Sequence, residues 1–172
     1  WASLWKKWPL GPPLDFDEIP GAGLQARGDA AGHWRSLTDA PWFDLRPKDG
    51  GQPEGWVLLS GRLTRRGPDY MARLRLDMGE GFDNGPIIEL PVSARGALFE
   101  VIHLPAGIRR MRFEPMRSSG EFEQSALTMT RLGGFARVAY MVMRVATMLR
   151  DQPRGRLRKA GLTPWGALCD LQ

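Results

Sequence analysis

The chain has 172 residues, with 24 Lys and Arg against 19 Asp and Glu, and therefore a net charge of +5. This length suffices for one main domain with a hydrophobic core. The basic residues are spread over most segments, which is typical of a solvated surface and argues against a nucleic-acid-binding protein. The single cysteine, Cys169, excludes an internal disulfide framework and any zinc site built from cysteines.

The first twenty residues are interpreted as an N-terminal arm. Trp1, Trp5 and Trp8 fall at helical spacing around two lysines. Such a segment either docks on the rest of a longer parent protein, which a first residue other than Met favours, or anchors at a membrane interface through its indoles. The sequence Gly-Pro-Pro at 11–13 ends any helix, because proline cannot donate a backbone hydrogen bond.

Residues 21–51 are dense in Gly, Ala, Asp and Pro, with two short apolar pieces at 34–37 and 42–45. Pro41 favours an extended conformation for the residue before it. These pieces predict brief edge strands, or extended arms, that cap a sandwich.

Two strands are predicted at 56–63 and 70–77, joined by a turn rich in Arg, Gly, Pro and Asp. The second strand alternates strictly, so one set of side chains is expected in the core and the arginines are expected on the solvent face. The expected core set is Tyr70, Ala72, Leu74 and Leu76, and the solvent set includes Arg73 and Arg75. We interpret the pair as the central hairpin of a sheet.

The loop after this hairpin is rich in glycine and contains Asp77, Glu80 and Asp83. Carboxylate oxygens in such a loop are suitable ligands for calcium, although their spacing is not that of an EF-hand. The loop therefore predicts either a calcium site or a plain acidic turn. No other cofactor is expected.

Further strands are predicted at 87–92, 98–104, 108–115 and 122–132, separated by Gly and Pro turns. In the third of these, Met111 and Phe113 should point inward, and Arg110, Arg112 and Glu114 outward. The fold class is therefore mainly β, an antiparallel jelly-roll-like β-sandwich over residues 21–131, followed by C-terminal α-helices.

The helical extension covers residues 132–172, and a downstream domain is expected after it. Its first helix is apolar on more than one side, but Arg137 and Arg144 make a membrane span unfavourable. Such a helix needs a second covering surface: a missing domain, another copy of the chain, or a membrane interface. The candidate contact residues are Phe135, Val138, Met141, Val142, Val145 and Met148, with Arg154, Arg156 and Arg158 as a basic cluster for anionic lipid or phosphate.

Four segments together carry a family resemblance: WRSLTDAPWFDL at 34–45, GWV at 55–57, LDMGEGF at 76–82 and LPAGIRRMRFEP at 104–115. In this order the chain resembles the N-terminal β-rich accessory region of bacterial glycosyltransferases of surface polysaccharide, of O-antigen or capsule type. The Asp-x-Pro step usual in that family falls at Asp39-Ala40-Pro41. The resemblance implies a cytoplasmic protein of lipopolysaccharide biosynthesis, peripheral at the inner membrane in one variant, with its catalytic domain downstream.

The residues themselves predict no catalytic group, because neither a Gly-rich phosphate loop nor a nucleophile elbow is present. The favoured function is a non-catalytic module that binds or positions glycan or docks the catalytic domain. The alternatives are a docking scaffold for a membrane or protein partner and, least favoured, a stand-alone carbohydrate-active enzyme. The candidate carbohydrate-binding residues are Trp34, Trp42, Trp56, Tyr70 and Phe82 for stacking, and Arg73 and Arg75 for polar contact.

Overall fold

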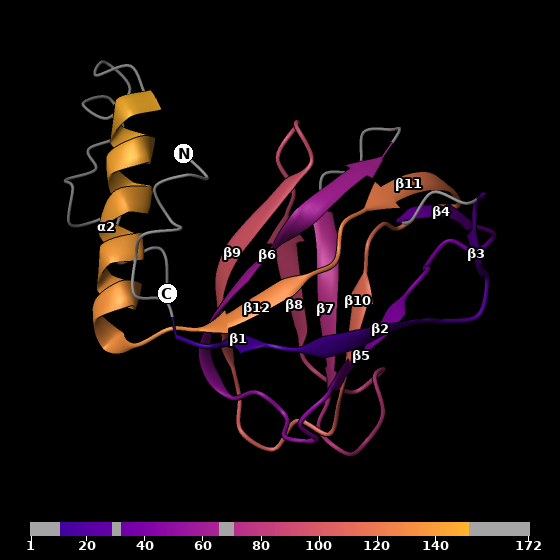
Figure 1. Ribbon diagram of the computed structural model, residues 1–172, viewed down its shortest axis with the longest axis horizontal. Coiled ribbons are helices and arrows are strands. Elements are labelled where there is room, and N and C mark those ends of the chain that lie inside the picture. The colour runs from indigo at the N-terminus through magenta and orange to yellow at the C-terminus, as the bar shows by residue number, and fades with distance from the viewer. Residues whose placement is uncertain (1–10, 29–31, 66–70, 152–172) are drawn as a thin grey trace. The chain divides into compact units, whose positions relative to one another are not determined.

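The computed structural model describes residues 11–28, 32–65 and 71–151, with the backbone alone from 143 onward. The chain divides into two units, Leu10–Leu132 and a second made of Trp1–Pro9 and Gly133–Gln172. Among the described residues, the first unit contains twelve strands and the second contains one helix, α2 (Gly134–Asp151) (Figure 1). The predicted class, mainly antiparallel β followed by C-terminal helix, is confirmed.

The first sheet has seven strands, and its long member, β6, pairs with three others. β9 lies along one edge of β6, while β12 and then β11 pair along the other edge. The remaining strands extend the sheet in the order β1-β12 at one side and β11-β4-β3 at the other. The bounds are β1 (Pro13–Leu14), β3 (Leu24–Ala26), β4 (His33–Ser36), β6 (Gly55–Arg65), β9 (Ala97–Leu104), β11 (Gly120–Gln124) and β12 (Thr128–Arg131).

The second sheet has five strands in the order β2-β5-β10-β7-β8, all antiparallel. In Figure 1, β6 and β12 of the first sheet lie in front of β7, β8 and β10 of the second. The bounds are β2 (Phe16–Pro20), β5 (Phe43–Pro47), β7 (Met71–Asp77), β8 (Ile87–Pro91) and β10 (Arg110–Glu114).

The interpretation of residues 56–77 as one hairpin is wrong, because β6 and β7 belong to different sheets. β7 pairs with β8 and β10, and β6 with β9, β11 and β12. β7 alternates as expected over most of its length, but alternation fixes which face is buried and leaves the pairing partner open. The connection at 66–70, and with it Tyr70, lies outside the described residues.

Three other expectations about strands also change. The pieces expected as edge strands, β4 and β5, are each paired on both sides. Residues 13–20, assigned to an N-terminal arm, form β1 and β2 instead. The strand expected at 122–132 is two strands, since β11 ends at Gln124 and β12 begins at Thr128. In the first two cases a short segment gains its strand pairing from neighbours that are distant in the chain, which a local pattern does not contain.

The core lies between the two sheets and is built from the inward side chains of each. Leu74 and Leu76 of β7 are fully buried, as is Phe113 of β10. Across the core, Leu59 and Leu63 of β6 are buried to the same degree. The burial of Ala72, Leu74 and Leu76 on β7 and of Met111 and Phe113 on β10 confirms their predicted inward positions and leaves the arginines of both strands on the outer face. Glu114, which was expected in solvent, is buried at 7% exposure because it pairs with Arg75.

Glu18 of β2 ties the two sheets together. Its Oε1 accepts the backbone N–H of Leu127 at 2.6 Å and its Oε2 accepts the side-chain amide of Gln124. Burial raises the pKa of Glu18 above the ordinary value, and these two hydrogen bonds oppose the shift. The contact therefore fixes β2, one of the two edge strands of the five-stranded sheet, to the segment joining β11 and β12.

Candidate functional site

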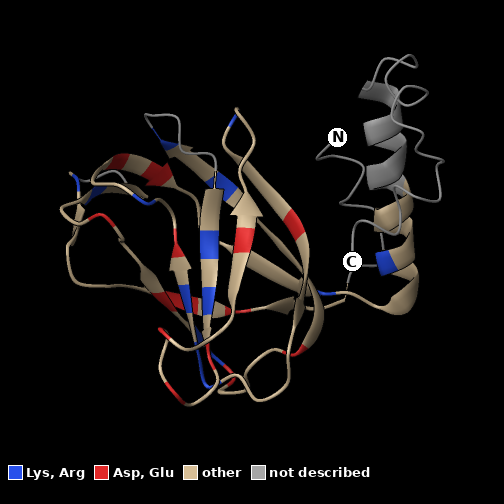
Figure 2. Cartoon of the chain, turned by 180° about the vertical axis from the view of Figure 1, so that it is seen from behind, with Lys and Arg blue, Asp and Glu red and all other residues tan. Residues whose placement is uncertain are grey.

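The outer face of the five-stranded sheet carries Arg73, Arg75 and Asp77, three of the polar side chains predicted to bind ligand. The strand register places Arg73 across from Glu89 and Glu114, and Arg112 across from Asp44 and Arg75. Figure 2 shows basic and acidic positions next to one another on neighbouring strands of this sheet. We call this surface the arginine face; its members are Asp44, Arg73, Arg75, Asp77, Glu89, Arg110, Arg112 and Glu114.

Each arginine of the face is paired with a carboxylate on a neighbouring strand or loop. The closest contacts are Arg73 Nη2–Glu89 Oε1 at 3.4 Å, Arg75 Nε–Glu114 Oε1 at 2.5 Å, Arg110 Nη2–Asp77 Oδ2 at 2.7 Å and Arg112 Nε–Asp44 Oδ1 at 2.8 Å. The side chains of Asp77 and Glu114 are only 4% and 8% exposed, whereas that of Arg110 is 62% exposed. Asp77 thus orients a guanidinium group that remains open to solvent, whereas the side chains of Arg73, Arg75 and Arg112 are 17%, 22% and 27% exposed.

Two aromatic rings support Arg112. Its guanidinium carbon lies 4.0 Å from the ring centre of Phe82 and 4.7 Å from that of Trp42. The Trp42 indole in turn packs on Gly21, where an added Cβ would come within 2.2 Å of the ring. Cation–π contacts of this kind fix a guanidinium plane. Trp42 and Phe82 therefore position Arg112, and sugar stacking by these rings stays a prediction.

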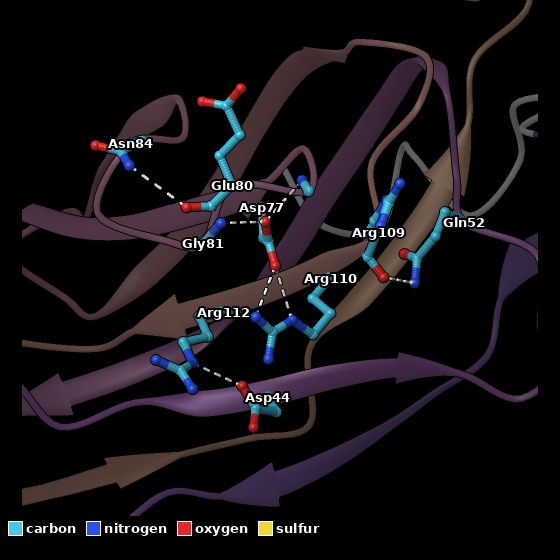
Figure 3. Close-up of polar contacts among 10 residues, drawn as sticks. Asp44, Gln52, Asp77, Glu80, Gly81, Asn84, Arg109, Arg110 and Arg112 are labelled. Atoms are coloured by element: carbon cyan, nitrogen blue, oxygen red, sulfur yellow. Dashed lines mark hydrogen bonds and ion pairs between the residues drawn. The ribbon is translucent and has the colours of Figure 1, made fainter.

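Asp77, at the end of β7, organises the loop beside the face (Figure 3). Its Oδ1 accepts the backbone N–H groups of Gly79 at 2.8 Å and Gly81 at 2.9 Å, and its Oδ2 accepts from Arg110 Nε at 2.8 Å. The hydrogen bond from Gly79, followed by that from Arg110, holds the pKa of Asp77 below its ordinary value of 3.8. The carboxylate thereby fixes both the loop and the direction of Arg110.

Asp77→Asn is expected to cost more stability near neutral pH than in acid. Because the folded-state pKa is depressed, the ionised carboxylate stabilises the fold above 3.8 and loses this contribution as pH falls through the lowered value. Urea unfolding of both proteins should show the difference in unfolding free energy shrinking between about pH 7 and about pH 3. Asp83→Asn, an exposed position in the same loop, serves as the control. A difference that is independent of pH would contradict the prediction.

The predicted calcium ligands are only partly available for an ion. Both oxygens of Asp77 already accept hydrogen bonds, and Glu80 and Asp83 are exposed. Within 11–28, 32–65 and 71–151, no group of three His, Cys, Asp or Glu residues is arranged to hold a metal. Calcium binding at this loop stays a prediction.

The other predicted sugar-stacking residues lie elsewhere. Trp34 faces the core, with its ring edge-on to Phe43 at a centroid distance of 5.0 Å. Trp56 lies on the seven-stranded sheet beside His103, at 5.1 Å. Trp42 and Phe82 thus lie beside Arg112, which is across from the predicted Arg75, whereas Trp34 and Trp56 lie elsewhere. Tyr70 lies outside the described residues.

Sequence reasoning missed the partners that shape the face. Arg110, Arg112 and Glu114 were expected only to point outward, and Asp44 was expected only to lie in a short strand. The alternation in β10 was the available signal, because it put two arginines on the same face as those of β7 once the strands pair. The pairing itself joins residues more than 30 apart and has no local signature.

Of the predicted partner-contact residues, four on α2 are exposed. Phe135, Val138, Met141 and Val142 are 77%, 54%, 38% and 62% exposed. No helix among the described residues is long and apolar enough to cross a membrane. The side chains of Val145 and Met148, and all of Trp1, Trp5, Trp8, Arg154, Arg156 and Arg158, lie outside the described residues. Contact of this segment with a partner, a membrane or a second copy stays a prediction.

Comparison with known proteins gave structural matches only, since no family model and no curated sequence matches the chain. A family 29 carbohydrate-binding module is 12% identical, with a TM-score of 0.42 over 67% of this chain and 81% of its own. The C-terminal CBM6 of a laminarinase from Zobellia galactanivorans is 12% identical, with a TM-score of 0.40 over 72% and 94%. A carbohydrate-binding module of Cellvibrio mixtus lichenase 5A, in complex with cellotriose, is 12% identical, with a TM-score of 0.42 over 72% and 99%. The similarity to these β-rich modules concerns the fold and does not identify a ligand for this chain.

Proposed function

We propose that this chain is a glycan-binding module whose ligand lies on the arginine face. The observation that carries the proposal is the set of four cross-strand arginines, each held by a carboxylate and all on one sheet face. A sugar hydroxyl both donates and accepts hydrogen bonds, so neighbouring hydroxyls match a surface on which guanidinium donors alternate with carboxylate acceptors.

The face is also pre-organised. Arg112 is fixed by Asp44 and by two rings, and Arg110 by the nearly buried Asp77. Immobilising a long side chain on binding costs about 0.5–1.5 kcal/mol, and side chains already held in place avoid much of that cost. Side chains fixed in this way support a binding role for the face. An ordinary solvated surface does not require its charged side chains to be held in place.

The parent protein we propose is a glycosyltransferase of bacterial surface polysaccharide, on the strength of the four-segment resemblance. In such a protein the module would hold the glycan for a downstream catalytic domain or dock that domain. In such a parent protein, the ligand of the arginine face would be the acceptor or the product glycan of the transferase.

Arg112→Ala is expected to weaken glycan binding by about tenfold or more, because it removes charge-assisted hydrogen bonds at the centre of the face. Titration calorimetry against a panel of oligosaccharides measures the effect. Arg35→Ala removes the same charge from an exposed position on β4 of the other sheet and should leave the affinity unchanged. The proposal fails if no oligosaccharide binds at about millimolar concentration, or if both variants lose affinity equally.

A further inference from the structure

A hollow of about 330 Å³ lies at the end of the arginine face where β10 begins. β5 contributes Asp44 and Arg46 to its lining, and the start of β10 contributes Arg109 and Arg110. Gln52, from the segment between β5 and β6, completes its polar lining. A volume near the lower end of the range for small-molecule sites, about 300–1,000 Å³, suits one sugar ring better than an extended chain.

The hollow concentrates positive charge. Extending the β5–β10 register by one residue beyond Met111↔Leu45 places Arg46 directly across from Arg110, with Arg109 next in the chain. Like charges directly opposite one another on a sheet are destabilising. Within the described part of the chain only Arg110 of these three has an ion-pair partner, Asp77. An anionic ligand bound in the hollow would relieve the electrostatic repulsion between these arginine side chains.

The nearby carboxylates are already committed to other cations. Asp44 lines the hollow, but its Oδ1 accepts from Arg112 at 2.8 Å. Asp17 lies across from Arg46 on β2, yet its ion pair, at 3.6 Å, is with Lys48. The charge inside the hollow therefore remains positive.

Gln52 adds an acceptor to this positive environment. Its Nε2 donates to the backbone carbonyl of Arg109 at 3.0 Å, a contact drawn in Figure 3. Its Oε1 is buried and has no hydrogen-bond partner among the described residues. A buried acceptor without a partner costs free energy that a ligand hydroxyl at this position would recover. The lining thus offers guanidinium donors for an anion beside an acceptor for a hydroxyl.

We infer that this hollow binds an acidic sugar residue, a uronate, whose carboxylate lies between the guanidinium groups of Arg46 and Arg109 and whose ring hydroxyl donates to Gln52. The inference rests on the proposed function, since the rest of the glycan would continue along the arginine face. A carboxylate suits the planar, two-pronged guanidinium geometry, and a sugar acid is the ligand that combines this group with adjacent hydroxyls. The ligand class is therefore an acidic glycan.

The test uses the full chain and matched pairs of glycans that differ only in charge. Uronate oligosaccharides, such as oligogalacturonate and oligomannuronate, are titrated beside their neutral methyl esters at low salt. The acid should bind about tenfold or more tightly than its ester. The double variant Arg46→Gln/Arg109→Gln should lose this preference and keep the affinity for the ester, because the ion pairs of the arginine face are untouched. Arg95→Gln, exposed in the loop before β9, removes one charge elsewhere and should change nothing.

The outcomes separate the inference from the function on which it rests. Equal binding of acid and ester overturns the uronate site and leaves the glycan-binding module standing. If the double variant still prefers the acid to its ester, the preference comes from general charge attraction and the uronate site is wrong. The same conclusion follows if Arg95→Gln abolishes the preference. If equimolar inorganic phosphate displaces the uronate, the hollow is a simple anion site and the inference of a sugar-acid site is overturned. Absence of binding by every pair overturns both proposals.

Discussion

Replacing Phe113 by alanine is expected to lower the free energy of unfolding by about 3–5 kcal/mol. Phe113 is the fourth of the five residues of β10, is 0% exposed, and pairs across the sheet with Phe43 on one side and Leu74 on the other. Removing the ring takes away its transfer free energy and leaves a cavity between two packed sheets that cannot close fully. Urea unfolding at neutral pH measures the change.

The control for this experiment is Ile87→Ala on β8, at a side chain that is 44% exposed. Substitutions at such surface positions usually change stability by less than about 0.5 kcal/mol. Phe113→Leu, which refills most of the volume, should recover a large part of the loss. A cost of Phe113→Ala no greater than that of Ile87→Ala would mean that the two sheets are not packed as described.

Phe113 also connects stability to the proposed site. It stands between Arg112 and Glu114 on β10, so one short strand supplies the core with its inward side chain and the arginine face with its outward ones. Damage to the core at this point should therefore weaken glycan binding as well as folding. Replacing Arg112 should weaken glycan binding without damaging the core, because its side chain is partly exposed and pairs with Asp44 on the outer face.

The inward and outward sets of β7 and β10 were predictable because a strand's side chains alternate with a period of two. Leu74 and Leu76 had to be buried if Arg73 and Arg75 were to remain outside, and the structure has them so. The helix at 134–151 was predictable for the same kind of reason, from apolar residues three and four apart. Local periodicity is a property of the sequence itself.

The assembly of the site was not predictable in this way. β6 and β7 are neighbours in the chain yet belong to different sheets, while β5 and β10 pair across more than 60 residues. The hollow depends on that second pairing, since it brings Arg46 opposite Arg110. Gln52 gave no signal at all, because its role comes from one contact with the backbone of Arg109. Long-range pairing is decided by the packing of whole sheets, which short windows of sequence do not specify.

Gly85→Ala is the second substitution with a large expected effect. Gly85 has no positive φ, so its importance is purely steric: a Cβ there would lie 1.7 Å from the backbone carbonyl oxygen of Leu76. The neighbouring hydrogen bond, from Leu76 N–H to the carbonyl of Pro86 at 3.0 Å, closes the connection between β7 and β8 at this point. Backbone cannot rotate aside as a side chain can, so the whole connection must shift, at a cost of about 1–3 kcal/mol or more.

The same shift should reach the binding face, because Asp77 follows Leu76 directly and fixes both the loop and Arg110. Gly85→Ala is therefore expected to lower the urea midpoint and to weaken glycan binding together. Gly51→Ala is the matched control: its φ is not positive and the nearest atom to its new Cβ is 3.9 Å away, so it should change stability by less than about 0.5 kcal/mol. If Gly85→Ala behaved like Gly51→Ala, the close approach of this loop to β7 would be wrong, and with it the position of Asp77 beneath Arg110.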